Sequence, residues 1–400
     1  MQRTNSPQER GGIATLLAST VGRVLVSLFV PIVTFLVLWQ GFLFLRDSDA
    51  PKIVITVVAI IWGVGGVALL YWVSNWLIEK LPTDWSARLL PYVFVGPAMA
   101  ILTWFLALPV LRTFWISLFG RGGPPDNLFQ ENISFAENFT NLGTNLTLYF
   151  SDFQWFGNYA AVFTERSMLE AFRNNVLWLI FGTGFSVVFG LLIAVLADRS
   201  RFEKIAKSLI FLPMAISFVG AGIIWKFIYA LKPITEPQIG LLNALVVGLG
   251  GEPKPWVAWT DYGFVNNFFL IVIVVWLQAG FAMVLFSAAL KGVPSELLEA
   301  ARVDGATEIQ IFFRIILPSI QGTIITVTTT VAIFTLKIFD VVLVMTGGQF
   351  GTEVIATNFY RQIFSNRNAG FGSAIAIVLL IAVIPVMIYN LRSFNEREAF

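Results

Sequence analysis

The sequence predicts an all-α membrane protein with about eight transmembrane helices, and three observations support this fold class. Hydrophobic residues make up 57% of the chain and charged residues only 12%, whereas soluble domains carry about 25% charged residues. Apolar stretches recur at the length of about 20 residues that a spanning helix needs. These stretches are too long for barrel strands, and in lipid only helices or closed barrels satisfy the backbone.

Eight apolar stretches are long enough to span a membrane. They lie near residues 22–45, 53–78, 90–118, 172–197, 206–231, 264–290, 319–345 and 371–392. The first stretch is too long for a signal peptide, and no small-residue cleavage site precedes a soluble domain. We therefore expect it to be a helix of the protein and not a cleaved leader.

Basic residues near the ends of these stretches predict the orientation of the chain. A compact basic segment from Arg199 to Lys207 follows the fourth stretch, and positive charge concentrates in cytoplasmic loops. An even number of spans places both termini on one side of the membrane. We expect both termini, and the polar segment 294–318, to face the cytoplasm.

The spans group into two membrane regions separated by a long polar connection. Residues 1–118 supply three helices, residues 119–170 form an extracytoplasmic loop rich in Gly, Pro and Asn, and residues 171–400 supply five helices with segment 294–318 between the sixth and seventh. Either a small ordered cap or a flexible loop fits the composition of residues 119–170.

Missing residue types exclude several functions. The chain has no Cys and no His, so disulfides and thiolate sites are excluded, and the commonest general base and metal ligand is absent. We expect no metal site and no catalytic residues. No G-x-x-x-x-G-K-[ST] motif occurs, so the chain is not itself an ATPase. A net charge of +2 gives no reason to expect nucleic-acid binding.

Segment 294–318 is the most informative part of the sequence. Glu299-Ala300-Ala301 is followed by three residues and Gly305, then by nine residues and Ile315-Ile316-Leu317-Pro318. We expect a short helix from Pro294-Ser295 with the Ser295 hydroxyl as its N-cap, a left-handed Gly305 at its end, and a capping box at Thr307–Gln310 that opens a second helix.

This pattern resembles the EAA loop of ABC-importer permeases. The resemblance implies that the loop docks on an ATPase subunit through Glu299, Ala300, Ala301, Asp304, Gly305, Leu317 and Pro318. It also implies a cytoplasmic (inner) membrane location and no cofactor of the chain's own, because the ATPase binds the ATP. The implied partners are a second permease subunit, two ATPase subunits, an extracytoplasmic solute-binding protein and membrane lipid.

Other motifs are similar to those of the larger permease subunit of maltose-type sugar importers. They are Phe211-Leu212-Pro213, Trp276-Leu277, Phe339-Asp340 and Thr346-Gly347-Gly348. The resemblance implies a sugar site between the sixth and seventh spans, at Leu277, Gln278, Phe281, Phe334 and Thr335. The match departs from that family in the seventh span, where the maltose permease has several amides and this chain has Thr335, Lys337 and Ile338. The external loop is also much shorter.

Lys337 and Asp340 are charges inside a predicted span, where charge is costly and tends to face a cavity or a partner. Their i, i+3 spacing on a helix would allow an ion pair, and contact with the substrate is the alternative. An importer permease for a sugar or glycoside is the leading interpretation. Glycerol phosphate as the substrate, a stand-alone secondary transporter or channel, and an intramembrane enzyme remain alternatives.

Overall fold

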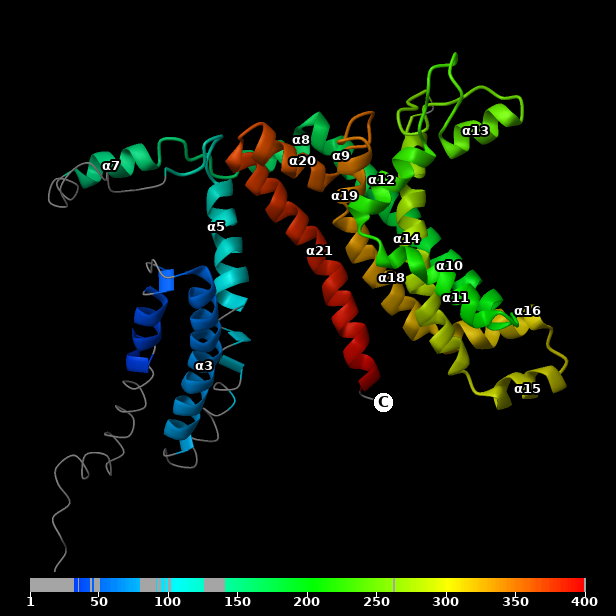
Figure 1. Cartoon of the computed structure of the whole chain (residues 1–400), viewed down its shortest axis with the longest axis horizontal. Helices are drawn as coiled ribbons and strands as arrows, with labels where there is room; N and C mark the ends of the chain where they lie inside the picture. The colour runs from blue at the N-terminus through cyan, green and yellow to red at the C-terminus, as the bar shows by residue number, and fades with distance from the viewer. Residues whose placement is uncertain are drawn as a thin grey trace, which may run out of the picture. The chain divides into compact units, whose positions relative to one another are not determined.

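The computed structural model describes residues 51–79, 102–125, 141–261 and 263–398, with short stretches between 32 and 46 and between 91 and 99. These residues are largely helical, and the strand-like pairing that they contain is one antiparallel bridge, Phe119–Phe153 (Figure 1). The all-α prediction is confirmed. The chain divides into two compact units, Met1–Val110 and Leu111–Phe400, and each is described by itself.

The first unit contains a long apolar helix, α3 (Lys52–Glu79), and a shorter apolar helix, Ile32–Leu43. The two helices pack closely, since a Cβ atom at Gly66 would lie 2.7 Å from Leu38 Cδ2 and the Trp62 indole donates to the Leu38 carbonyl at 3.2 Å. Small residues that allow helices to approach are typical of membrane packing. Half of the predicted span 22–45, and part of the predicted span 90–118, lie outside the described residues.

The second unit carries the remaining helices. In chain order they are α5 (Leu108–Ser117, which begins at the boundary), α7 (Leu142–Tyr149), α8 (Gly157–Thr164), α9 (Arg166–Leu177), α10 (Thr183–Asp198), α11 (Glu203–Phe211), α12 (Phe218–Ile228), α13 (Leu241–Gly248), α14 (Val265–Lys291), α15 (Ser295–Val303), α16 (Glu308–Ile311), α17 (Leu317–Ser319), α18 (Gln321–Leu336), α19 (Asp340–Met345), α20 (Ile355–Tyr360) and α21 (Ala369–Glu398). Short π-helical or 3₁₀ segments continue several of them, among them Trp178–Gly182, Leu212–Ala215, Phe312–Ile316 and Arg361–Ser365.

Within the described residues, four uninterrupted helices are long and apolar enough to cross a membrane. They are Lys52–Val73, Arg166–Asp198, Val265–Lys291 and Ala369–Tyr389. Two bent pairs raise the number to six if each is counted as one span: Glu203–Ala215 with Phe218–Ile228, bent by 103°, and Glu308–Ser319 with Gln321–Leu336, bent by 69°. The total of eight spans, like the division at residues 118 and 170, stays a prediction.

The predicted fifth and seventh spans are each broken and do not form single helices. In the fifth, Pro213 lies in a 3₁₀ turn and Ser217 caps the next helix by accepting from the Gly220 N–H at 3.0 Å. In the seventh, α18 ends at Leu336, and the chain turns at Phe339 (φ −140°, ψ −61°) before α19 begins at Asp340. The second break, at residues 337–339, contains neither Pro nor Gly. The local sequence therefore gives no signal that the helix ends there.

Helix α14 is the centre of the second unit, and its predicted span of 264–290 is confirmed to within a residue. It packs tightly along α10, because a Cβ atom at Gly190 would lie 2.4 Å from Ala282 Cβ. One buried cluster joins α14 to α12 and α19, the second halves of the broken spans, through Ala221, Leu277 and Val341. A second joins α14 to α18 through Phe286, Val327 and Val331. Both broken spans therefore rest on one straight helix.

Candidate functional site

The segment 294–318 folds as two short helices with a sharp corner. Helix α15 ends at Val303, and Gly305, two residues further on, has a φ of +80°. The Ala306 N–H donates to the Ala301 carbonyl at 3.0 Å and the Gly305 N–H to the Arg302 carbonyl at 3.1 Å. This pair of bonds is the Schellman arrangement, in which Gly is favoured because it has no Cβ. The predicted left-handed helix end is confirmed.

The start of α16 is also as predicted, whereas the start of α15 is not. The Gln310 N–H donates to Thr307 Oγ1 at 3.3 Å and the Thr307 N–H to Gln310 Oε1 at 2.8 Å, which completes the capping box. The expected Ser295 cap is wrong, because α15 begins at Ser295 itself and Pro294 occupies the cap position without a side-chain bond. A residue inside the first turn no longer has the geometry of an N-cap.

Ion pairs brace the corner. Arg302 Nε donates to Glu308 Oε1 at 2.9 Å, and Arg199, from the basic segment after α10, lies 3.7 Å from the other oxygen of Glu308. The hydrogen bond to Glu308 raises the pKa of the Arg302 guanidinium above its ordinary value. Each pair is exposed and contributes little stability alone, but together they connect the corner to the end of α10.

The corner exposes a group of large apolar side chains. Val303 is 87% exposed and Ile309 is 72% exposed, and Leu297 and Phe313 are also exposed. Glu299, Ala300, Asp304, Gly305 and Pro318 lie on the surface, whereas Ala301 is buried and Leu317 packs against the α14–α18 cluster. Exposed apolar patches with a polar surround are typical of protein contact sites.

A partly buried charge cluster lies where the loop joins the helix bundle. Lys207 of α11 pairs with Asp198 at the end of α10 and with Glu203 at 2.6 Å, and Glu203 also pairs with Lys291 at the end of α14. The Ser287 hydroxyl donates to Asp198 Oδ1 at 2.7 Å. The cluster fixes three helix ends beside the loop. We did not predict it, because the sequence shows these residues only as scattered loop charges.

At the other end of the unit, four buried asparagines hold the loop between α19 and α20. Asn174 donates to the carbonyls of Gly351 and Glu353, both at 2.8 Å. Asn266 donates to the Phe350 carbonyl at 2.6 Å and Asn267 to the Gly351 carbonyl at 3.3 Å.

The fourth asparagine, Asn175, connects two helix ends. Its amide donates to the Leu336 carbonyl at 3.1 Å and accepts from the Ile355 N–H at 2.8 Å. It therefore satisfies a carbonyl at the end of α18 and an N–H at the start of α20, groups that a helix leaves without partners.

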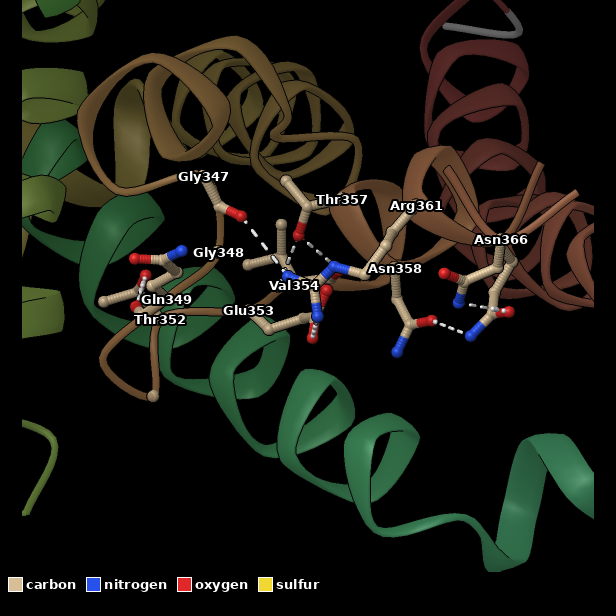
Figure 2. Close-up of polar contacts among 12 residues, drawn as sticks. Gly347, Gly348, Gln349, Thr352, Glu353, Val354, Thr357, Asn358, Arg361 and Asn366 are labelled. Atoms are coloured by element: carbon tan, nitrogen blue, oxygen red, sulfur yellow. Dashed lines mark hydrogen bonds and ion pairs between the residues drawn. The ribbon is translucent and has the colours of Figure 1, made fainter. Parts of the chain in front are cut away.

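An ion pair with a buried carboxylate lies at the same loop (Figure 2). Arg361 Nη1 donates to Glu353 Oε2 at 2.8 Å, and the Glu353 side chain is only 6% exposed. Arg361 also donates to the Gly347 carbonyl at 3.3 Å. Burial raises the pKa of the Glu353 carboxyl above its ordinary value, partly offset by Arg361 and reinforced by Glu170. The second oxygen of Glu353 has no hydrogen-bond partner within the described part of the chain.

Comparison with known proteins assigns the family. Residues 186–396 match the model of the binding-protein-dependent transport system inner membrane component. The chain belongs to this family. It is therefore a membrane-embedded transport permease that works with a binding protein, and the recognised resemblance to importer permeases is confirmed.

Two relatives are similar to this permease over most of their length. The osmoprotective compounds uptake permease protein GgtC of Synechocystis sp. is 49% identical over 76% of this chain and 99% of its own. The alpha-glucoside transport system permease protein AglF of Rhizobium meliloti is 45% identical over 77% of this chain and 83% of its own. A crystal structure of a bacterial ABC transporter involved in the import of the acidic polysaccharide alginate shares the fold, with a TM-score of 0.59, 20% identity and coverage of 78% and 97%.

The positions expected to bind sugar lie on α14 and α18 of the permease, but they differ in access. Phe334 is 49% exposed, and Gln278 is 7% exposed with no hydrogen-bond partner for its amide among the described residues. Phe281 is half-buried against the α14–α18 cluster. Leu277 is buried in the cluster of α12 and α19. Phe334, Gln278 and Phe281 remain the candidate contacts.

Thr335 is buried like Gln278, but its hydroxyl is already hydrogen-bonded within the protein. It is fully buried, its hydroxyl donates to the Val331 carbonyl at 2.8 Å, and it accepts from Thr183 of α10 at 3.4 Å. A Cβ atom at Gly182 would lie 3.3 Å from the Thr335 methyl group. In this arrangement Thr335 packs α18 against α10, so its expected role as a substrate contact would require it to leave that packing.

The expected ion pair between Lys337 and Asp340 is absent from the structure. Helix α18 ends before Lys337 and α19 begins at Asp340, so the two residues do not lie one turn apart on a continuous helix. Lys337 is exposed and Asp340 half-buried. The Lys337 ammonium thus lies at the break without a carboxylate partner among the described residues, and it is free to contact an anion.

An apolar cavity of about 460 Å³ lies where the fifth span bends. Its walls include Pro213, Trp225, Trp276 and Ala279. It contains none of the predicted sugar-site residues, because Trp276 and Ala279 lie on another side of α14 from Gln278. Its walls offer few hydrogen-bonding groups for sugar hydroxyls.

Proposed function

We propose that this permease imports a sugar or glycoside as part of an ATP-driven transporter, with segment 294–318 as the docking site for an ATPase subunit. The corner between α15 and α16 carries the proposal. It is a compact knob, braced by ion pairs and fixed by caps at Gly305 and Thr307, and it exposes Val303 and Ile309. A protein socket would cover these apolar side chains.

The same contacts support the proposed orientation. The ion pair between Arg199 and Glu308 brings the basic segment 199–207 to the same end of the unit as the corner. Basic segments favour the cytoplasm, which is where ATP is. Both termini then lie in the cytoplasm, and the loop between α19 and α20 faces the outside. The partners are two ATPase subunits, a second permease subunit and an external solute-binding protein.

The substrate class rests on the residues at α14 and α18 and on the relatives. Phe334 offers an exposed ring at the end of α18 and Gln278 offers an amide without a protein partner. Rings pack against the apolar face of a sugar, and amides bind its hydroxyls. The relative AglF is named for alpha-glucosides and GgtC for osmoprotective compounds. A neutral glycoside is the substrate that fits both observations.

One observation favours a second candidate, an anionic solute such as glycerol phosphate. Lys337 lies exposed at the helix break with no ion pair to Asp340. A charge inside a membrane protein that has no partner in the protein tends to serve a ligand.

The test is assembly followed by uptake. The permease should co-purify with an ATPase subunit, and the reconstituted complex should take up radiolabelled solutes from a panel of disaccharides, glycosyl-polyols and glycerol phosphate. Uptake of a neutral glycoside that depends on ATP supports the proposal. Uptake of glycerol phosphate alone supports the second candidate, and transport without an ATPase would refute both.

A further inference from the structure

Three residues other than glycine have a left-handed backbone in the described part of the chain. They are Trp155 (φ +50°), Phe350 (φ +58°) and Arg367 (φ +52°). Trp155 is 67% exposed and Phe350 is 46% exposed, and Arg367 is exposed as well. This conformation is sterically unfavourable for residues with a Cβ atom, and glycine is the usual occupant. The chain therefore keeps a large, solvent-facing side chain at three places where glycine would fit better.

Two of the three lie beside one short segment, residues 118–121. On one side, the Gln154 N–H donates to the Leu118 carbonyl at 2.8 Å, next to Trp155. On the other side, the Ala369 N–H donates to the Arg121 carbonyl at 2.8 Å, and the Arg121 guanidinium donates to the Asn366 carbonyl, next to Arg367. Trp155 and Arg367 are thus held on one hydrogen-bonded scaffold.

Phe350 belongs to the same end of the unit. Its neighbour Gly351 accepts from Asn174 of α9, and α9 follows α8, which begins two residues after Trp155. Figure 1 shows α8, α9 and α20 together at one end of this unit, with α15 and α16 at the other. By the proposed orientation, the end that carries the three residues faces the outside.

The surrounding structure forces each backbone into this conformation. Trp155 is the second residue of a turn closed by the Gly157 N–H on the Gln154 carbonyl at 2.9 Å, a position where left-handed turns favour Gly. Arg367 follows the end of helix Arg361–Ser365, another position that favours Gly. Phe350 is held by the asparagine bonds. Unfavourable backbone that is over-determined in this way concentrates at functional positions.

We propose that Trp155, Phe350 and Arg367 are docking contacts for the external solute-binding protein. This inference rests on the proposed function, which sets the outer end. The family depends on a binding protein, and that protein approaches from the end of the bundle rather than from its lipid-facing sides. Trp and Arg, with aromatic side chains in general, are enriched at the centres of protein interfaces. Rigid presentation lowers the ordering cost of binding.

Substitution by glycine separates docking from folding. Trp155→Gly, Phe350→Gly and Arg367→Gly each remove a side chain and also relieve the backbone, so thermal stability should stay equal or rise. If the side chains dock the partner, the concentration of solute-binding protein that half-maximally stimulates ATP hydrolysis should rise about tenfold for each variant. Phe163→Ala is the control, because Phe163 is 59% exposed on the regular helix α8 and should leave that concentration unchanged.

A photo-crosslinking amino acid at Phe350 identifies what touches the loop. We expect it to capture the solute-binding protein, identified by mass spectrometry, and the same residue at Phe163 to capture none. Unchanged half-maximal concentrations in all three glycine variants, or crosslinks only to the second permease subunit or to lipid, would overturn the inference while leaving the proposed function intact. A wild-type complex that no solute-binding protein stimulates would overturn the proposed function and this inference together.

Discussion

Replacing Gly305 tests whether the corner of segment 294–318 couples the permease to its ATPase. A Cβ atom at Gly305 would meet nothing within 4 Å, so a side chain there costs only the left-handed backbone. That cost is about 1–2 kcal/mol for an L-residue, a shift of about 5- to 30-fold in the equilibrium between the intact corner and an opened loop. Gly305→Ala and Gly305→Leu should therefore weaken ATPase docking to a similar extent.

Gly305→Asn is the matched control, because asparagine enters the left-handed region more readily than other residues. Docking would be measured by titrating the ATPase subunit onto the reconstituted permease, and coupling by the stimulation of ATP hydrolysis. We expect the order Gly, then Asn, then Ala and Leu together. If Leu were far worse than Ala, bulk would matter and the backbone argument would fail. If all four behaved alike, the corner would have no part in coupling.

Three further predictions follow from the membrane orientation, the break in α18 and the buried carboxyl. In the native background, which lacks Cys, a cysteine at Thr144 should react with an impermeant thiol reagent from outside and one at Ser295 only after the membrane is opened; the reverse pattern would invert the orientation. Phe334→Ala should weaken transport of a neutral glycoside about tenfold, through loss of ring contacts of about 0.5–1.5 kcal/mol plus buried area; if Lys337→Met abolishes transport while Phe334→Ala has no effect, the solute is anionic. Burial raises the pKa of Glu353, so the folded state holds that proton to higher pH than the unfolded state, and this contribution to stability should fall as pH rises through the raised pKa. Thermal unfolding of Glu353→Gln should lack that pH dependence, and equal slopes for the two proteins would contradict the assignment.

Local signals in the sequence were sufficient for the straight helices and the corner. The span 264–290 coincides with α14, and Gly305 and the Thr307–Gln310 box adopt the predicted conformations. These features depend on residues within one or two turns of each other, so composition and spacing carry them. The Ser295 cap was misplaced by a single residue, the usual precision of a helix boundary.

The break in the seventh span depends on contacts with residues distant in the sequence, so the neighbouring residues alone do not predict it. The Leu336 carbonyl at the break is satisfied by Asn175, 161 residues away in the sequence. The absence of the Lys337–Asp340 pair and the burial of Thr335 follow from the same tertiary arrangement. The apolar runs contained Asn175, Asn266 and Asn267, but an isolated asparagine in such a run does not reveal which carbonyl it will bind.

The asparagine bonds have a consequence for solute selectivity. The side-chain amides of four asparagines donate to backbone carbonyls of the permease itself: Asn174, Asn175, Asn266 and Asn267. A polyhydroxylated solute that passes these helices finds those amides already occupied and has to exchange its hydration shell for other groups. Gln278 is an amide in α14 that has no hydrogen-bond partner in the described part of the chain. Discrimination between solutes that differ by one hydroxyl would then depend largely on this side chain. Shortening it would reduce the selectivity of transport without changing the fold.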